Sequence, residues 1–500
     1  MLAWTIYLSF AGALVQALLP KGHCALARWL ALTVTLAGFV LGVIGFLSGT
    51  GQGRLVITDL DWIPSAGIRY TLAADGISLV LVLLTGLAAV AGVLFSWNVE
   101  LRCNEFFAFY LALIGGVYGV FLSFDLFLLF VFYEIAIVPK YFLIAIWGST
   151  RREFGAMKLA LYSFVGSAMV LVGLLAAYAA SGARSTGLVE LAHAGLPTSF
   201  QMWIFPLVFV GFAILAGMWP FHTWAPTGHV AAPTAASMLL AGVVMKLGAY
   251  GCLRVAIALF PHGMDPWGFS ILGIGSWRDV FAVLAVIGIV YGALVALVQS
   301  DFKFVIGYSS VSHMGFVLLG LMTLNQIGMT GAVLQMFSHG VIAGLLFAIV
   351  GRIVYERTHT RQLAELETMH LSKRLPFAAW AFVIAGIASM GLPGFSGFVA
   401  ELQVLAGSWK ADPWWAGSAG VGIVVGVAYT WRALQRAFFS DLAPAAHIHE
   451  HGHELAPITW PEVAGVSLLI AASLLVGLYP RILLDAIEPA VRSMLAGGVQ

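Results

Sequence analysis

Charged residues are scarce in this 500-residue chain. Asp, Glu, Lys and Arg make up 9% of the residues, and hydrophobic residues make up 61%. Roughly a quarter of the residues in a soluble domain are charged, so a soluble globular protein is excluded. The net charge of +1 offers no extended basic surface, and we do not expect nucleic acid as a partner.

Cysteine is also rare, and phosphate-binding patterns are missing. The three cysteines, Cys24, Cys103 and Cys252, are far apart and lack the spacing of metal ligands. We therefore expect neither a disulfide framework nor an iron–sulfur cluster, and any electron carrier must bind to another chain. The glycine-rich stretches follow no strand-to-helix phosphate-binding pattern, which argues against a nucleotide site.

Long apolar segments fill most of the chain. About fourteen of them reach the length of roughly 20 residues that a helix needs to cross the bilayer core. The strands of a membrane barrel would alternate in polarity, whereas these segments are apolar on all sides, so helices are favoured. The first run, residues 2–19, has no basic start or cleavage site, and we expect it to be a retained span. The predicted fold is an all-α, polytopic membrane protein with span centres near Ala11, Ala37, Ala88, Gly115, Ile135, Val170, Val210, Val244, Gly288, Val311, Leu345, Ile384, Val424 and Ser473.

The loops between these segments differ in their content of basic residues. One side of the membrane holds most of them, and such loops remain cytoplasmic. We therefore predict a multi-pass protein of the cell inner (plasma) membrane with both termini outside the cytoplasm. The cytoplasmic set is Lys21, Arg28, Arg102, Arg151, Arg152, Arg352, Arg357, Arg361, Lys373, Arg374, Arg432 and Arg436, and the opposite set includes Arg54, Arg69, Arg184 and Lys410.

Two apolar segments contain breaks, GMWPFH at 217–222 and GLPGFSG at 391–397. Proline removes an amide donor, and an interrupted helix at membrane depth is tolerated only against protein or water. Paired breaks in two halves of a chain indicate inverted repeats around an ion site at the midplane. The predicted organisation is three N-terminal helices in 1–100, a five-helix repeat in 101–262, a second in 276–440, and a cytoplasmic loop with the last helix in 441–500.

Isolated ionisable residues lie within three of the apolar runs: Glu134 in FLLFVFYEIAIV, Lys246 in LLAGVVMKLGAYG and Glu401 in GFSGFVAELQVL. In hydrocarbon such groups are costly, so they normally face a protein interior or a wet cavity and mark an ion or proton pathway. Structural pairing with the backbone or with one another is their alternative role. These residues predict an ion-translocating membrane protein.

Several longer motifs surround these residues: FYEIAIVPKYFLIAIWG, HTWAPTGHVAAPTAASMLLAGVVMKLGAYGCLR, SDFKFVIGYSSVSHMGFVLLG, QMFSHGVIAGLLFAIVGRIVYERTHTR and GLPGFSGFVAE. In this order they resemble the antiporter-like membrane subunits of respiratory complex I, and in particular the M type, the mitochondrial subunit-4 type. The resemblance covers nearly the whole chain.

The resemblance implies a proton-translocating, non-redox membrane-arm subunit of an NADH:quinone oxidoreductase. FMN, iron–sulfur clusters and quinone are expected on other subunits, and L-type and N-type antiporter-like chains are expected as neighbours within the lipid bilayer. By motif, Glu134 resembles the fifth-helix carboxylate, Lys246 the central eighth-helix lysine and Glu401 the acid beside the second broken helix. His313 and His339 resemble histidines of the connecting hydrophilic axis, and histidine can pass protons in either direction near neutral pH.

One position departs from the family pattern. The family usually carries a lysine in the seventh helix, where this chain has Leu215. Lys140 is the obvious replacement partner for Glu134. Six residues at about 100° each, however, place Lys140 roughly 120° around the helix from Glu134. Long cationic side chains near helix ends also tend to reach headgroup water, which is the competing expectation for Lys140.

Other polar residues carry weaker indications. His222 and His229, beside the first break, are either members of a proton path or loop caps. Asp301 and Lys303 fit a helix start, where an acid is favourable, and Lys158 is expected to reach the interface. The histidines between His447 and His453 are expected in a solvated loop, because no regular element fixes a metal geometry there.

Two other assemblies share these features. The large subunits of multi-subunit cation/proton antiporters have the same broken helices and buried lysine, and hydrogenase-linked pumps use a related module. The shared residues do not separate these alternatives. The QMFSHG-containing string and the acid that ends GLPGFSGFVAE favour the complex I chain.

Overall fold

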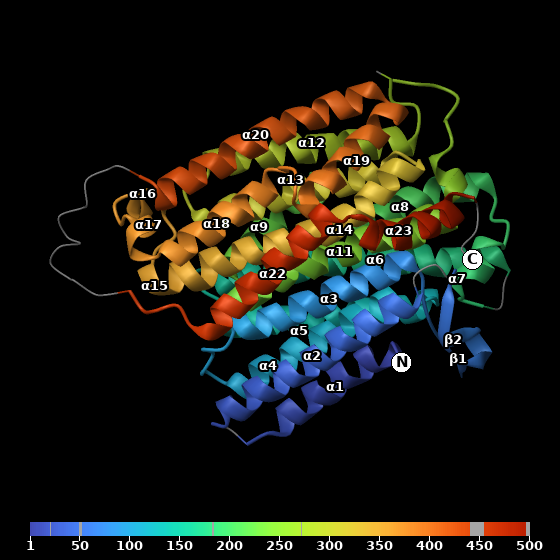
Figure 1. Cartoon of the computed structure of the whole chain (residues 1–500). Helices are drawn as coiled ribbons and strands as arrows, with labels where there is room; N and C mark the ends of the chain where they lie inside the picture. Colours follow the sequence, from blue (N-terminus) through green and yellow to red (C-terminus); the bar gives the residue numbers. More distant parts are fainter. Residues whose placement is uncertain (21, 50–52, 183–184, 272, 441–454, 497–500) are drawn as a thin grey trace.

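Long helices run side by side through most of the computed structural model (Figure 1). The structure describes the whole chain except residues 21, 50–52, 183–184, 272, 441–454 and 497–500. Within the described part, eleven helical segments are long and apolar enough to cross a membrane, and α1 and α18 are shorter apolar helices. The helical, polytopic membrane fold is confirmed, whereas the count of fourteen spans stays a prediction.

The helices of the first half are α1 (Ala3–Leu18), α2 (Cys24–Gly49), α3 (Gly76–Phe95), α4 (Cys103–Leu122), α5 (Leu126–Trp147), α6 (Arg152–Ser181), α7 (Leu188–Ala192), α8 (Thr198–Ala216), η2 (Phe221–Thr223), α9 (Trp224–Ala231), α10 (Thr234–Leu239), η3 (Leu240–Val244), α11 (Met245–Gly251), η4 (Cys252–Ile257) and η5 (Pro261–Met264). Those of the second half are α12 (Trp277–Val298), α13 (Phe302–Met322), α14 (Gln326–Ala348), η6 (Ile349–Tyr355), α15 (Glu356–Thr358), α16 (Leu363–Leu366), α17 (Leu371–Arg374), α18 (Pro376–Ser389), α19 (Ser396–Ala411), α20 (Pro413–Phe438), α22 (Trp460–Leu478) and α23 (Arg481–Leu495).

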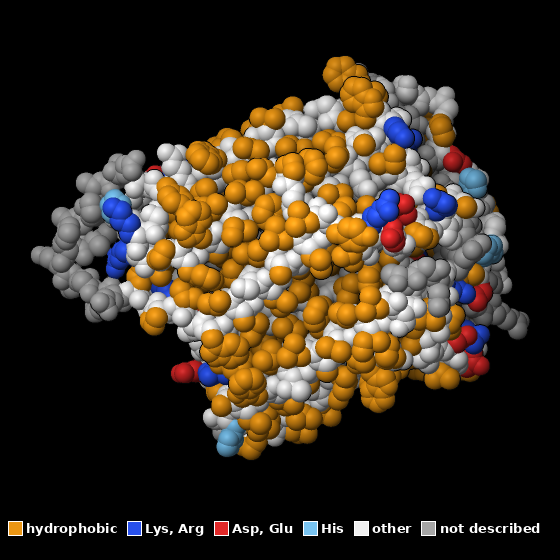
Figure 2. Space-filling model, in the orientation of Figure 1, with side chains coloured by type: hydrophobic (Ala, Val, Ile, Leu, Met, Phe, Trp, Pro, Cys, Tyr) orange, Lys and Arg blue, Asp and Glu red, His pale blue; other side chains and the backbone are white. Residues whose placement is uncertain are grey.

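Large apolar side chains cover the outside of the helix bundle (Figure 2). Trp414, Trp203 and Val424 expose 82%, 77% and 70% of their surface. In the same view the charged side chains gather toward the two ends of the bundle. An apolar belt between polar ends is what a bilayer requires of a spanning protein, because hydrocarbon takes the place of water around the belt.

Side-chain caps fix where many of the spans begin. The side chain of Asp75 accepts a hydrogen bond from Ser78 N, and that of Asp125 accepts one from Leu128 N. Ser276, Asn325 and Asp412 bind first-turn amides of α12, α14 and α20 in the same way. Each cap satisfies an amide that the helix itself leaves without a partner.

A two-stranded antiparallel hairpin lies at the end of the bundle that also holds both chain termini (Figure 1). It consists of β1 (Leu55–Ile63) and β2 (Ile68–Ala74), joined by η1 (Pro64–Ala66), with Asp59 opposite Thr71 in its register. The all-α prediction overlooked this hairpin. Its strands are rich in β-branched and aromatic residues, but they lie in a short connection between two strongly apolar helices, which dominate the hydropathy pattern.

Both predicted helix breaks are confirmed. The helix α8 ends at Ala216 before Gly217, whose φ is +83°, and the chain becomes helical again in η2 and α9. The second break separates α18 from α19, and Gly391 within it has a φ of +70°. Three π-helical turns, η3, η4 and η6, were not expected; they interrupt the helices of Lys246 and His339. Such turns occur frequently at functional sites.

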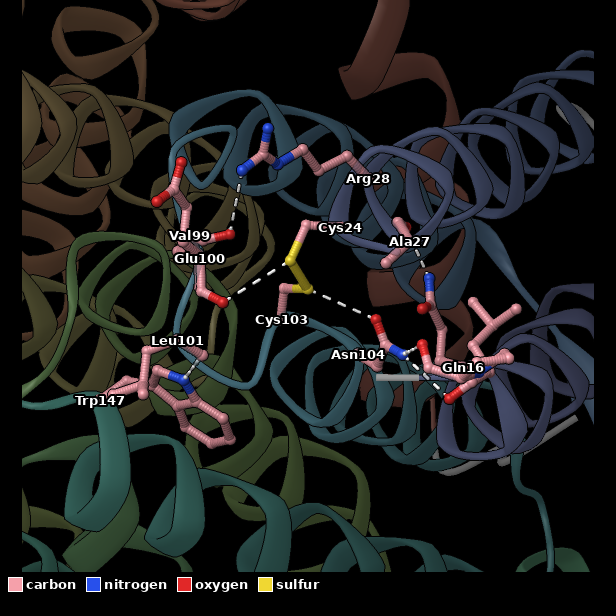
Figure 3. The surroundings of a disulfide bond; sticks show 12 residues. Gln16, Cys24, Ala27, Arg28, Val99, Glu100, Leu101, Cys103, Asn104 and Trp147 are labelled. Carbon is pink, nitrogen blue, oxygen red and sulfur yellow. Dashed lines mark hydrogen bonds between the residues drawn. A yellow bond between two sulfur atoms is a disulfide. The ribbon is translucent and has the colours of Figure 1, made fainter. Parts of the chain in front are cut away.

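Cys24 and Cys103 form a disulfide that joins the first turn of α2 to the first turn of α4 (Figure 3). The two Cα atoms are 5.6 Å apart, although 79 residues separate the cysteines in sequence. The expectation that the cysteines form no disulfide was therefore wrong. Distance along the chain is a poor guide here because α1, α2 and α4 pack together and bring the starts of α2 and α4 to one place. Cys252 is free and buried.

Ion pairs also join helices at the end of the bundle that holds α15–α17. Glu462, on α22 and 1% exposed, lies 2.8 Å from Arg357 Nη2 and 2.9 Å from Arg352 Nε. It also accepts a hydrogen bond from Thr459 N at 2.7 Å. At the opposite end, Arg254 Nη2 lies 2.5 Å from Asp75 Oδ2 and thereby joins η4 to the start of α3.

We expect Glu462→Gln to destabilise the chain because the buried Arg357 loses the carboxylate with which it pairs and Arg352 keeps only Glu356. Loss of one partner from a buried ion pair costs about 3–5 kcal/mol. The measurement is the thermal unfolding midpoint in purified membranes, with Asp485→Asn on the exposed face of α23 as the control. An unchanged midpoint for Glu462→Gln would show that the two arginines do not depend on this carboxylate.

Candidate functional site

Four of the predicted site residues meet inside the bundle. Lys246 comes from α11, His339 from α14, His313 from α13 and Glu401 from α19. Lys246, His339 and Glu401 expose at most 5% of their surface, and the side chain of His313 exposes 12%. We refer to these four residues, in this order, as the polar file.

Lys246 and His339 form the first contact of the polar file. Lys246 Nζ lies 2.9 Å from His339 Nδ1, and it also donates a hydrogen bond to Ala241 O in the π-helical turn η3. When Lys246 is an ammonium group, Nδ1 must accept and Nε2 must carry the ring proton of His339. His339 Nε2 is buried and has no hydrogen-bond partner within the described residues.

His313 and Glu401 form the opposite end of the polar file. His313 Nδ1 lies 3.1 Å from Glu401 Oε1, which makes an ion pair when the imidazole is protonated. Gln335 Nε2 lies 3.4 Å from the same ring nitrogen and 3.5 Å from the carboxylate oxygen. Ser389 Oγ lies 3.4 Å from His313 Nε2. Both ring nitrogens of His313 therefore have polar neighbours.

The two histidines connect the ends of the polar file. Their rings stack with centroids 5.4 Å apart and an interplanar angle of 27°. The file thus runs from a buried amine through two imidazole rings to a buried carboxyl group, across four helices. Each group can bind or release a proton, and a change of charge on one alters the electrostatic energy of the next.

The second helix break shapes the Glu401 end of the polar file. A Cβ added to Gly391 would lie 2.6 Å from Glu401 Oε2, and its φ of +70° also favours glycine. Directly after the break, Ser396 Oγ at the start of α19 lies 2.8 Å from Ser338 Oγ and 3.1 Å from Ser473 Oγ. The interruption therefore makes room for the carboxylate and joins α19 to α14 and α22 through hydroxyl groups.

Glu134 and Lys140 lie apart from the polar file, on α5. No hydrogen bond or ion pair joins either residue to the file within the described part of the chain. Lys140 is 1% exposed, and neither its Nζ nor Glu134 Oε1 has a hydrogen-bond partner there. The expectation that Lys140 reaches headgroup water was wrong. The charges of Glu134 and Lys140 are close enough to interact, and Pro139 between them interrupts the helical hydrogen bonds.

His222 and His229, beside the first break, do not act as loop caps. All four of their ring nitrogens are without hydrogen-bond partners in the described structure. His229 is fully buried, with Phe347 5.0 Å from its ring. Leu215, at the position of the missing lysine, is buried in α8.

The predicted cap at Asp301 is confirmed. Its carboxylate accepts hydrogen bonds from Lys303 N and Phe304 N, and it pairs with Arg361 at 3.1 Å. Lys303 has a further role that its sequence position does not reveal, since its buried Nζ donates to Ala232 O at the end of α9. Lys158 is half-buried and donates to Thr227 Oγ1 at 3.4 Å, so its amine is not simply exposed at the interface as expected.

Gln335 and Ser389 are site residues that the sequence reasoning missed. Both are uncharged, and the search for isolated charges in apolar runs passes over them. Gln335 lies four residues before His339, on the same face of α14, and this spacing was the available signal. The predicted His447–His453 loop residues lie outside the described residues, as do Lys21 and Arg184.

Known proteins resemble this chain closely. Residues 123–426 match the family described as NADH:quinone oxidoreductase/Mrp antiporter, TM. NADH-quinone oxidoreductase subunit M of Rhodobacter capsulatus is 36% identical and aligns with 98% of this chain and 95% of its own length. NAD(P)H-quinone oxidoreductase chain 4 1 of Synechococcus elongatus is 35% identical over 98% of this chain and 90% of its own. A chain in the structure of respiratory complex I from Thermus thermophilus with bound NADH superposes with a TM-score of 0.88 over 99% of both chains, at 27% identity.

A pair of glycine variants tests the geometry at the second break. Gly391→Ala and Gly394→Ala both introduce a Cβ at a positive φ, which costs about 1–2 kcal/mol. Only Gly391→Ala places its new Cβ against Glu401, because nothing lies within 4 Å of a Cβ at Gly394. We therefore expect Gly391→Ala to lower the thermal unfolding midpoint further than Gly394→Ala. Equal losses would show that Glu401 moves away freely.

Proposed function

Because this chain belongs to the NADH:quinone oxidoreductase/Mrp antiporter transmembrane family, we propose that it is an M-type, proton-translocating membrane-arm subunit of an NADH:quinone oxidoreductase. The observation that carries the proposal is the polar file of Lys246, His339, His313 and Glu401. The file gives protons a lateral route through a bundle whose outer surface is apolar.

Proton transfer along the file follows from its contacts. Transfer from the Lys246 ammonium to His339 Nδ1 gives a neutral amine and an imidazolium, across 2.9 Å. His339 Nε2 then releases its proton toward His313, through a water or a ring rotation, because the stacked rings do not bond directly. The Glu401 carboxylate, 3.1 Å from His313 Nδ1, stabilises the second imidazolium until the proton leaves.

In this assembly the chain's own residues supply proton transfer, and other subunits carry the electrons to quinone. The energy comes from quinone reduction elsewhere in the complex, and FMN, iron–sulfur clusters and quinone bind to other subunits. A charge that arrives beside Glu134 changes the proton affinity of the ionisable groups near it. The energy of quinone reduction can reach this chain through such a change in charge. In this proposal the chain is the subunit of the oxidoreductase complex that translocates protons.

Glu134 and Lys140 form the second, smaller element of the proposal. Lys140 takes the place of the lysine that the family carries where this chain has Leu215. Its burial without a hydrogen-bond partner supports this role, because an isolated buried ammonium group requires a nearby counterion or water. Glu134 is the acid in electrostatic range.

The placement in the cell follows the charge distribution. The end of the bundle with α15–α17 carries Arg352, Arg357 and Arg361 and is the cytoplasmic end under the positive-inside rule. Both termini then lie outside the cytoplasm, in the inner (plasma) membrane. L-type and N-type antiporter-like subunits are the proposed neighbours along the apolar sides of the bundle.

A subunit of a cation/proton antiporter, or of a hydrogenase-linked pump, is the alternative within the same fold. The identities of 35–36% to chains named as quinone oxidoreductase subunits support the complex I assignment instead. Under either alternative the polar file would still carry ions, so the discriminating observation is co-purification with flavin and iron–sulfur subunits.

We expect Lys246→Met and Glu401→Gln to abolish coupled proton pumping in the assembled complex. Each variant removes a proton-binding group from an end of the file, and a positioned acid or base contributes on the order of a hundredfold or more to a proton-transfer rate. The measurement is proton uptake into membrane vesicles during NADH oxidation, normalised to assembled complex. Lys410→Met, an exposed lysine on α19, is the control. Normal pumping in both file variants would contradict the proposal.

Lys140→Met tests the second element. We expect it to lower pumping substantially while the complex still assembles, because Glu134 loses the cation in its electrostatic range. Lys373→Met, at an exposed position on α17, provides a matched control. The same vesicle assay serves as the readout, and pumping equal to that of the control would assign Lys140 a structural role only.

A further inference from the structure

The Cys24–Cys103 disulfide lies at the bundle end that carries the basic residues. Cys103 directly follows the 96–102 loop, and Asn98 in this loop donates a hydrogen bond to Glu356 Oε2 on α15 at 2.8 Å. Arg28, on α2 beside Cys24, donates to Val99 O at 3.2 Å (Figure 3). By the charge rule this end faces the cytoplasm, where thiol reductants normally keep cysteines reduced.

Cys24 is the accessible member of the cysteine pair. It is partly exposed, whereas Cys103 is 2% exposed and borders a surface cleft of about 440 Å³. The polar residues that line the cleft are Glu100, Arg102, Asn104 and Glu105. Its volume lies in the range of about 300–1,000 Å³ that suits small ligands.

The surroundings accommodate the reduced pair as well as the disulfide. Cys24 Sγ lies 3.6 Å from Glu100 O, and Cys103 Sγ lies 3.4 Å from Asn104 Oδ1. Both oxygens can accept a hydrogen bond from a thiol. Asn104 is held in this orientation because its Nδ2 donates to Leu19 O and Pro20 O. Reduction therefore leaves neither sulfur without a polar partner (Figure 3).

The loop beside the disulfide borders the same cleft as the start of the helix of Lys246. Leu101 O accepts a hydrogen bond from Trp147 Nε1 of α5 at 2.7 Å. On its other side the loop lines a second cleft, of about 330 Å³, whose wall includes Pro233, Thr234 and Ala235. These residues begin the helical segment that continues to Lys246. The disulfide thus fixes one anchor of a loop that borders this segment.

We propose that Cys24 and Cys103 are a reversible thiol–disulfide exchange site for a low-molecular-weight thiol/disulfide couple at the cytoplasmic end of the bundle. In the oxidising direction the Cys24 thiolate attacks one sulfur of the small disulfide RSSR, and a mixed disulfide forms as RS⁻ leaves. The Cys103 thiolate then attacks Cys24 Sγ and releases the second RS⁻. Two protein thiols and RSSR become one protein disulfide and two RSH, with two electrons passing to RSSR.

Oxidation ties α2 to α4 and holds the 96–102 loop against both helices. Reduction removes the covalent anchor and leaves the loop held by hydrogen bonds and by the packing of Trp97 against Trp29 and Trp460, so its backbone amides open more often to solvent. The ratio of reduced to oxidised small thiols in the cell therefore determines how ordered the 96–102 loop is. This role does not depend on proton translocation.

Thiol counting in membrane vesicles that contain the assembled complex tests the proposal. After an acid quench, the denatured chain is labelled with a maleimide of large mass. The chain has three cysteines, so the reduced form takes three labels and the oxidised form, with only Cys252 free, takes one. We expect oxidised glutathione, which does not cross the membrane, to convert three labels to one in inside-out vesicles, and reduced glutathione to restore three. Cys252→Ser is the matched control, with two labels converting to none.

Hydrogen exchange gives a second readout on the same material. We expect reduced glutathione to speed exchange in residues 96–102 severalfold in the wild-type chain and to change nothing in the Cys24→Ser, Cys103→Ser double variant. A label count that stays fixed under both reagents, or that changes only in right-side-out vesicles, would overturn the proposal. So would equal exchange rates in the reduced and oxidised wild-type chains.

Discussion

Hydrocarbon offers no partner to a charge, and this constraint governs how the bundle is built. Arg357 and Arg352 meet Glu462 at one end, and Arg254 meets Asp75 at the other. Between these pairs the polar file holds Lys246 against His339 and His313 against Glu401. The pairs at the ends use arginine, which stays charged, and therefore fix the helices in place. The groups in the middle are of types that can gain or lose a proton, which is what the proposed proton transfer requires.

Lys246 and Glu401, at the two ends of the polar file, can be predicted from the sequence because each is an isolated ionisable residue in an apolar run. The helical bundle leaves few places for such a group other than the interior. The two helix breaks can also be predicted from the sequence, because glycine and proline act locally on the backbone. His313 and His339, in contrast, were predicted from their resemblance to histidines of the family's hydrophilic axis.

Features that depend on contacts between distant segments were not predictable in this way. The disulfide requires α2 and α4 to start at the same place, which no local pattern encodes. The burial of Lys140 depends on the helices packed around α5, and the reach of a long side chain toward water was the wrong guide. Gln335 and Ser389 matter only because His313 and Glu401 lie beside them. The hairpin of β1 and β2 was hidden by the strong apolar pattern on either side.

The π-helical turns η3 and η4 flank Lys246 on its own helix. A π turn contains one residue more than the α-helical path around it, so the side chains on either side of it are offset by about 100° relative to an uninterrupted helix. The direction in which the Lys246 amine points into the bundle is therefore set by these two turns as well as by its position in the sequence.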